Sequence, residues 1–461
     1  MSELKDKLFY QQKCVYDRIS KEEMTEADAY CEGYKKFLND AKTEREAITA
    51  AVALAEVNGF KPYVRGQKLN PGDKIYKINR GKALMLAVIG KASLAEGVNI
   101  AGAHVDSPRL DLKQVPLYEE SEMALFKTHY YGGIRKYQWV TIPLELHGVV
   151  AMKDGTVIQV KIGGEAEDPV FVITDLLPHL AAEQNKKKLN EAITGESLNL
   201  VIGSLPEREE TEGERVKLAV LKILNEKYGI TEEDFLSAEL EAVPAMNARD
   251  VGLDHSMIGS YGHDDRVCAY AELRAILELG VPEKTAICLL VDKEEIGSEG
   301  VSGMQSAAFE CFMADLCTDQ AVKLAHCFEN SFCLSADVCN ALDPTYPEVS
   351  ERRNNAKLGY GLAISKFTGA RGKSGSSDAS AEIIGKLRRM FDGHNVIWQM
   401  GELGKVDQGG GGTIAMYMAN RNIDTIDAGV PVLSMHAPYE LVSKLDCYMT
   451  YKGMKSLYDE K

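Results

Sequence analysis

The chain has 461 residues, which is enough for two or three domains and for a sizeable buried core. Hydrophobic residues make up 45% and charged residues 26%, as in ordinary globular proteins. The formal net charge is −16 and the longest basic run is Lys186–Lys188, so we expect no nucleic-acid partner and no binding to anionic membranes.

Residues 1–60 are expected to be mainly helical, because apolar residues recur among polar ones and an Ala-rich run follows before Gly59. Charges interrupt the N-terminal segment every few positions, so we expect no signal peptide. No stretch is apolar over the roughly 18 residues of a membrane helix. The 10 cysteines contain no CxxC pair, which favours free thiols in a reducing cytoplasm over a zinc ribbon or a disulfide framework.

Short strands are expected next, including one over 84–90 and one over 99–106. The second of these reads NIAGAHVD, apolar at first and then abruptly polar. Sheets of α/β proteins place their functional residues at the C-terminal ends of strands. We therefore expect a site at the end of this strand.

The pattern changes between residues 115 and 246. Segments 139–152 and 155–163 alternate at period two with Gly and Asp turns between them, which is typical of half-buried strands. A charged stretch and a helical run follow, over 207–216 and 218–230. We expect residues 115–246 to form an inserted β-rich domain that interrupts a catalytic domain made of residues 1–114 and 247–461.

Strands alternate with helices in the second half of the chain. The predicted strands lie within 284–298, 331–340 and 429–440, and the predicted helices within 268–280 and 378–391. This alternation predicts an α/β fold with a mostly parallel sheet flanked by helices on both faces.

Five segments share one feature, an apolar strand that ends in a side chain able to bind a metal. They are AHVD (103–106), GHDDR (262–266), VDKEEIGS (291–298), SADV (335–338) and SMHAPYE (434–440). Together they supply two histidines and several carboxylates, a ligand set that suits Zn²⁺ or a similar divalent ion.

Each segment alone is ambiguous. His104 and Asp106 are either a metal ligand with the carboxylate that steadies its ring, or a satisfied histidine at a strand end. Asp264 and Asp265 are costly to bury without a cation. Either one of them bridges two metal ions, or the pair is exposed at the N-cap of the helix that follows.

Glu294 and Glu295 have two interpretations as well. One glutamate binds metal while the other deprotonates a water, or the pair lies in a solvated turn. Asp337 and His436 are isolated side chains, each weak evidence by itself.

In their order and spacing, these five segments resemble those of the M18 family of metallo-aminopeptidases. The resemblance covers nearly the whole chain, including the β-rich part and the tail over 374–413. It implies a fold of the two-zinc exopeptidase type and the release of N-terminal amino acids from peptides. It also implies two divalent metal ions per subunit, Zn²⁺ above all, with Mn²⁺ or Co²⁺ as alternatives.

The resemblance assigns the metal ligands residue by residue. His104 and Asp337 bind one ion, Asp264 bridges both, and Glu295 and His436 complete the second.

It assigns supporting roles too. Glu294 is the general base that acts on a metal-activated water, and Asp106 orients His104. The β-rich insertion mediates contacts in a homo-oligomer, a tetrahedral dodecamer, and His179 in the segment LPHLA reaches a neighbouring active site. The alternative for His179 is a helix histidine packed on its own domain.

Substrate preference stays open between acidic and neutral N-terminal residues. Arg371, Lys373 and Lys405 are candidates for a cationic side-chain pocket, yet segment 369–379 departs from the aspartyl-type pattern. The run Gly409–Gly412 is suited to close approach of a substrate backbone. Two rivals remain: a two-metal carboxypeptidase or deacylase, and a non-catalytic shell protein, which would be expected to have lost ligands.

Overall fold

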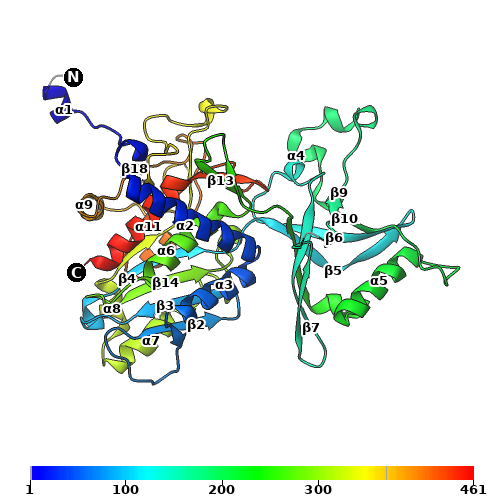
Figure 1. The fold of residues 1–461 in the computed structure, drawn as a ribbon, viewed down its shortest axis with the longest axis horizontal. Coiled ribbons are helices and arrows are strands. Elements are labelled where there is room, and N and C mark those ends of the chain that lie inside the picture. Colours follow the sequence, from blue (N-terminus) through cyan, green and yellow to red (C-terminus); the bar gives the residue numbers. More distant parts are fainter. Residues whose placement is uncertain (1–2, 166, 370, 461) are drawn as a thin grey trace.

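A computed structural model describes residues 3–165, 167–369 and 371–460, and in them the strands form three sheets (Figure 1). The largest sheet has nine strands. In order they are β1 (Lys61–Pro62), β2 (Lys74–Asn79), β3 (Ala83–Val88), β14 (Ala286–Val291), β4 (Asn99–His104), β15 (Phe332–Ser335), β19 (Asp424–Gly429), β17 (Leu362–Ser365) and β18 (Trp398–Met400). The central strands β14, β4, β15 and β19 are parallel, while β3 and β17 flank them antiparallel.

Helices cover both faces of this sheet, as the alternation of elements predicts. One face packs against α2 (Lys21–Asp40), α3 (Glu44–Val57), α6 (His263–Leu277), α9 (Ala381–Gly393) and α11 (Lys444–Asp459). The other packs against α7 (Ala308–Asp319), α8 (Leu324–Glu329) and α10 (Ala415–Ala419). Strand β3 shows why its sequence is continuously apolar: Leu84 and Leu86 enter the first core, and Met85 and Ala87 the second.

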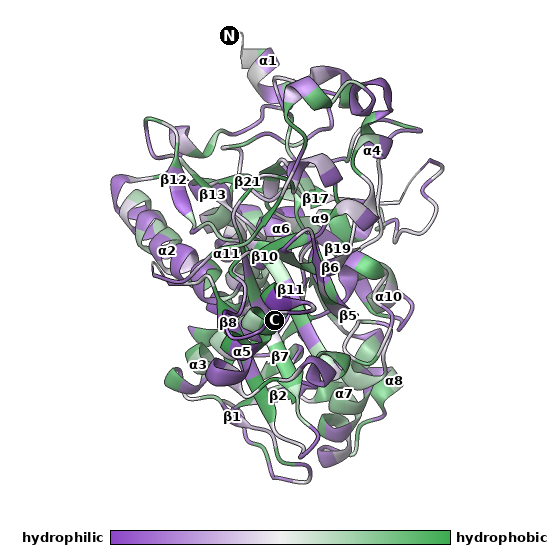
Figure 2. Cartoon of the chain, turned by 90° about the vertical axis from the view of Figure 1, so that its right-hand side faces the viewer, coloured by the Kyte–Doolittle hydropathy of each residue, from purple (hydrophilic) through white to green (hydrophobic). Residues whose placement is uncertain are grey.

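The N-terminal helices begin where the sequence supplies caps. Ser20 and Glu23 form a capping box at α2, and Thr43 and Glu46 form one at α3. A short helix, α1 (Glu3–Leu8), precedes them. Figure 2 shows hydrophilic and hydrophobic residues alternating along α2, which buries Tyr34 and other apolar residues against α6 and α11.

The second sheet lies to one side of the first, at the right of Figure 1. Its seven strands are β8 (Val157–Ile162), β7 (Leu144–Ala151), β11 (Ala238–Pro244), β5 (Arg109–Glu120), β6 (Met123–Tyr131), β10 (Leu200–Gly203) and β9 (Val172–Ile173). With α5 (Arg215–Tyr228) it has its own core around Trp139, and the short helix α4 (Leu189–Ala192) contributes no buried residue to it. β5 starts at Arg109, before residue 115, and its first two residues, Arg109 and Leu110, are buried.

A third sheet of five strands corrects one expectation. It consists of β12 (Arg249–Val251), β13 (Met257–Ser260), β21 (Glu440–Ser443), β20 (Pro431–Leu433) and β16 (Cys339–Asn340). The strand predicted within 429–440 therefore does not extend the parallel sheet. It pairs antiparallel with β21, because the chain turns back sharply through 434–439.

No helix in the described part of the chain is long and apolar enough to cross a membrane. The ten cysteines are all free.

Candidate metal centre

Three neighbouring strands of the main sheet bring the first group of candidate ligands together. His104 is the last residue of β4, Glu294 and Glu295 lie in the turn after β14, and Asp337 follows β15. Because β14, β4 and β15 are parallel neighbours, their carboxyl ends meet at one edge of the sheet.

The remaining ligands come from the third sheet. Asp264 lies at the start of α6, directly after β13, and His436 lies in the turn between β20 and β21. These two residues therefore also follow strands, but the strands belong to a different sheet. The turns of the small sheet lie against the edge of the large sheet. The ligands from the two sheets therefore lie next to one another.

The carboxylate of Asp264 lies between the two histidines. Its Oδ1 is 3.1 Å from Nε2 of His104, and its Oδ2 is 3.1 Å from Nε2 of His436. Glu295 Oε1 is 3.5 Å from His436 Nε2. Asp337 Oδ1 is 3.9 Å from His104 Nε2. One carboxylate thus joins two imidazoles, each with a further carboxylate beside it.

Two sets of three side chains can converge on a cation, with ligand atoms within 4.8 Å of one another. One set is His104, Asp264 and Glu295, and the other is His104, Asp265 and Asp337. Asp265 was not among the ligands expected from the sequence. The sequence feature that could have indicated Asp265 is its place next to Asp264. In the structure the backbone at the start of α6 directs the carboxylate of Asp265 into the protein, where it is buried.

The chemistry of the group fits a divalent cation. Among the described residues, buried carboxylate oxygens of Asp265 and Glu295 have no hydrogen-bond donor. Burial raises the pKa values of Asp337, Asp265 and Glu295 well above the ordinary range. So many carboxylates cannot stay ionised together in a buried site without a positive charge, and a metal ion would supply it.

The pKa shifts differ within the group. Burial would raise the pKa of Asp264, but hydrogen bonds from His104 and His436 outweigh it and hold that pKa well below its usual value. Burial lowers the pKa of His436, yet contact with Asp264 raises it to about 10. Burial also raises the pKa of Glu294 to about 7, so this carboxyl can exchange a proton near neutral pH.

Asp106 contacts His104 and the backbone of the two glutamates. Nδ1 of His104 is 2.9 Å from the backbone carbonyl oxygen of Asp106 and 3.3 Å from its Oδ1. The carbonyl is thus the nearer acceptor for the ring. The carboxylate accepts instead from the backbone N–H groups of Glu294, at 3.1 Å, and Glu295, at 3.2 Å.

Glu440 is a supporting residue that sequence reasoning missed. It is buried, and its two oxygens accept from the backbone N–H groups of His436, at 2.7 Å, and Asp264, at 3.1 Å. Burial raises its pKa to about 8. The sequence feature that could have indicated Glu440 is its place at the end of the segment SMHAPYE, which also contains His436.

A cavity of about 470 Å³ opens onto Asp264, Glu294, Glu295, Asp337 and His436. Its other walls include Val338, Phe367, Leu403 and Met435, and the glycines Gly410, Gly411 and Gly412. Arg371, Lys373 and Lys405 line a separate cavity of about 360 Å³ that shares Phe367 and Leu403 with the first.

His179 lies apart from this cavity. It belongs to a short 3-10 helix, Pro178–Leu180, beside the second sheet, and it is exposed. Within one chain it does not line the cavity around the metal ligands.

Comparisons with known proteins point to one family. A family profile described as "Aminopeptidase I zinc metalloprotease (M18)" matches residues 37–458. A protein from Clostridium acetobutylicum named "Probable M18 family aminopeptidase 1" is 51% identical over 454 residues, which cover 97% of this chain and 98% of that protein.

Solved structures agree. A crystal structure of an M18 family aminopeptidase from Thermotoga maritima has a TM-score of 0.94 at 45% identity, covering 98% of this chain and 100% of that one. The structure described as the mApe1 dodecamer of yeast shares the fold, with a TM-score of 0.75 at 20% identity over 94% of this chain and 99% of that one.

Proposed function

This chain belongs to the M18 family of zinc metallo-aminopeptidases, and we propose that it releases N-terminal residues from peptides using two metal ions and Glu294 as the general base. The observation that carries the proposal is the position of Asp264, whose two oxygens face two different histidines at equal distance. A carboxylate placed in this way is suited to bridging two cations.

These contacts support one assignment of ligands. His104 and Asp337 would hold one ion, Glu295 and His436 would hold the other, and Asp264 would contact both. Histidine nitrogen and carboxylate oxygen suit Zn²⁺, and Mn²⁺ or Co²⁺ can take the same ligands.

Zinc ions bound there supply Lewis acidity at the scissile carbonyl and lower the pKa of the attacking water. Glu294 takes a proton from that water, and its pKa near 7 makes both proton uptake and release accessible. It then returns the proton to the departing amine. Asp106 holds the backbone of Glu294 in place during both steps.

The cavity suits the free N-terminus of a peptide. Carboxylates at its base attract an ammonium group, while Val338, Phe367, Leu403 and Met435 offer apolar walls. Among the described residues, its lining contains no lysine or arginine. We propose that neutral N-terminal residues are preferred over acidic ones.

Replacement of Glu294 by glutamine tests the general base. Glu294→Gln is expected to keep its zinc and to lose about 10²- to 10⁴-fold in kcat, because glutamine cannot accept the proton. Glu299→Gln is the matched control, since Glu299 is exposed on the same segment and should leave kcat unchanged. Turnover at the parent rate in Glu294→Gln would rule out this role.

A second part of the proposal concerns assembly. Residues 115–246 would form an inserted domain through which copies of this cytoplasmic enzyme join as a dodecamer. Leu176, Leu177 and Leu180 support this, because these apolar side chains are at least half exposed around His179. A second copy of the chain that covers them would bring His179 near a neighbouring active site.

Sedimentation velocity and kinetics test this arrangement together. His179→Ala is expected to keep the assembled size and zinc content but to lose kcat. His326→Ala, at an exposed histidine of α8, should change neither. A monomer in solution, or unchanged kcat in His179→Ala, would contradict the proposal.

A further inference from the structure

Three consecutive residues at the end of β6 reach from the second sheet into the metal centre. Tyr131 is the last residue of that strand, and Gly132 and Gly133 follow it. Each of the three contacts a different part of the centre. This segment is far in sequence from every proposed ligand.

Tyr131 contacts Asp106. Its hydroxyl donates to Oδ2 of Asp106 at 2.8 Å, and both side chains are buried. The same oxygen accepts from the backbone N–H of Glu295, and the other accepts from that of Glu294. The hydroxyl thus completes the set of donors around a carboxylate that is fully shielded from water. Without it, the carboxylate would lose one donor that water cannot replace.

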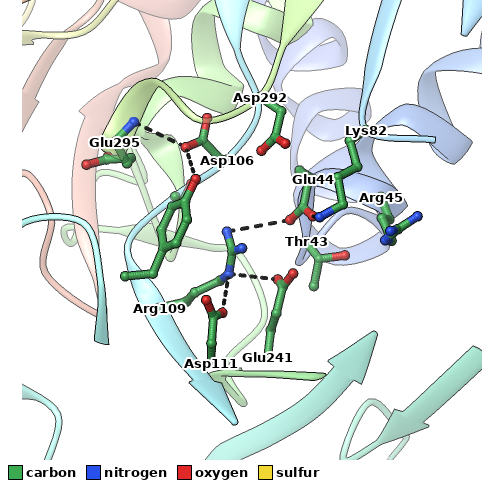
Figure 3. A network of polar contacts seen from close by, with 12 residues as sticks. Thr43, Glu44, Arg45, Lys82, Asp106, Arg109, Asp111, Glu241, Asp292 and Glu295 are labelled. Carbon is green, nitrogen blue, oxygen red and sulfur yellow. Dashed lines mark hydrogen bonds and ion pairs between the residues drawn. The ribbon is translucent and has the colours of Figure 1, made fainter. Parts of the chain in front are cut away.

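Arg109 holds the tyrosine ring. Its guanidinium carbon lies 3.8 Å from the centre of that ring. The guanidinium is itself fixed by carboxylates from both parts of the molecule (Figure 3). Nε is 2.8 Å from Asp111 and 3.2 Å from Glu241, and Nη1 is 3.5 Å from Glu44 of α3.

The two glycines approach the centre closely. Gly132 has a φ of +73°, and a Cβ there would lie 3.1 Å from Oε2 of Glu295. The carbonyl oxygen of Gly133 accepts from Nδ1 of His436 at 2.8 Å, and a Cβ there would lie 3.3 Å from that nitrogen. A Cβ at either position would require Glu295 or His436 to shift by a few tenths of an ångström, which glycine avoids.

We propose that Tyr131 is a positioning residue of the metal centre: its hydroxyl fixes Asp106, which in turn fixes His104 and the backbone of both glutamates. Arg109, held by Glu44, Asp111 and Glu241, fixes the ring of Tyr131. The second sheet therefore contributes residues that position the metal ligands. The inference rests on the proposed function for the place of the metal ions.

The test replaces Tyr131 by phenylalanine in the full chain and measures zinc affinity by competition with a fluorescent chelator. Tyr131→Phe removes only the hydroxyl, and we expect zinc to bind about 10- to 100-fold more weakly. With saturating zinc, kcat is expected to fall more than KM changes. Tyr130→Phe is the matched control, since Tyr130 is partly exposed on the opposite face of β6 and should bind zinc like the parent.

A double-mutant cycle separates positioning from a general effect on folding. If Tyr131 acts through Asp106, then Tyr131→Phe changes zinc affinity by less than about twofold in an Asp106→Ala background. Equal losses in both backgrounds would overturn the proposal, and so would parent-like zinc affinity in Tyr131→Phe. Full turnover by Glu294→Gln would instead overturn the general base and leave this test intact.

Discussion

The carboxylate of Glu440 fixes the backbone of His436, accepting its N–H through Oε1 at 2.7 Å. The other oxygen accepts the N–H of Asp264, so one buried side chain sets the positions of a proposed terminal ligand and the proposed bridge. Because both contacts are to backbone N–H groups, Glu440 fixes the backbone positions of His436 and Asp264. These hydrogen bonds do not set the rotamers of the two side chains.

Glu440→Gln is the first prediction. A glutamine amide has one oxygen, so one of the two N–H groups would face an NH₂ group and lose its acceptor. We expect about 10- to 100-fold weaker zinc binding and a matching loss of kcat at limiting zinc. Chelator competition measures the first and steady-state kinetics the second, with Glu299→Gln as the unaffected control.

Metal content per chain provides the second prediction. The parent is expected to hold about two zinc ions. Asp337→Ala and His436→Ala should each lose mainly one ion, whereas Asp264→Ala should lose both, because Asp264 contacts both histidines. Elemental analysis after dialysis gives the counts.

Asp424→Ala is the control for these counts, since Asp424 is exposed at the opposite end of β19. Retention of both ions by Asp264→Ala would show that it is not the bridge. Loss of an ion in Asp265→Asn would show that Asp265 is itself a metal ligand.

The third prediction concerns substrates. Leucyl p-nitroanilide is expected to have at least about tenfold higher kcat/KM than aspartyl p-nitroanilide, because the cavity walls are apolar and its base is acidic. Lys405→Met should leave this ratio unchanged, since Lys405 lines the adjacent cavity. A preference for the aspartyl substrate would contradict the proposed cavity.

The same assay separates the rival two-metal hydrolases. N-acetyl-leucyl p-nitroanilide has no free ammonium group for the carboxylates to bind, and we expect no cleavage. An enzyme that released p-nitroaniline from it as fast as from the free form would not be an aminopeptidase.

The fourth prediction is a loss of stability in acid that originates at His263. Burial lowers its pKa to about 3. Its ring is held neutral, with Nδ1 2.8 Å from the hydroxyl of Tyr34 and Nε2 3.1 Å from the carbonyl oxygen of Ile258. The unfolded chain binds a proton below about pH 6.5 and the folded chain does not, so the stabilising contribution is full above 6.5 and is lost toward pH 3.

The free energy of unfolding in urea measures this effect. Between pH 6.5 and 4.5 the parent should lose about 1.4 kcal/mol per pH unit more than His263→Gln does. His326→Gln, which changes an exposed histidine, should follow the parent. Parallel pH profiles for parent and His263→Gln would show that His263 is not the source.

The family and the α/β class could be predicted from the sequence alone. Apolar runs that end in AHVD, VDKEEIGS and SADV predict neighbouring parallel strands, because strand burial and strand ends leave local patterns. These strands do lie side by side, and the inferred membership in the M18 family is confirmed. The roles of individual ligands stay predictions.

The assembly of the site could not be predicted from the sequence, because it depends on the tertiary structure. It placed Asp264 and His436 at turns of a separate small sheet, turned Asp265 inward, and brought Glu440 and Tyr131 beneath the ligands. None of these relationships leaves a periodic signal, since each joins segments far apart in sequence. They depend on where sheets pack against one another, which is set by the burial of whole surfaces rather than by any short motif.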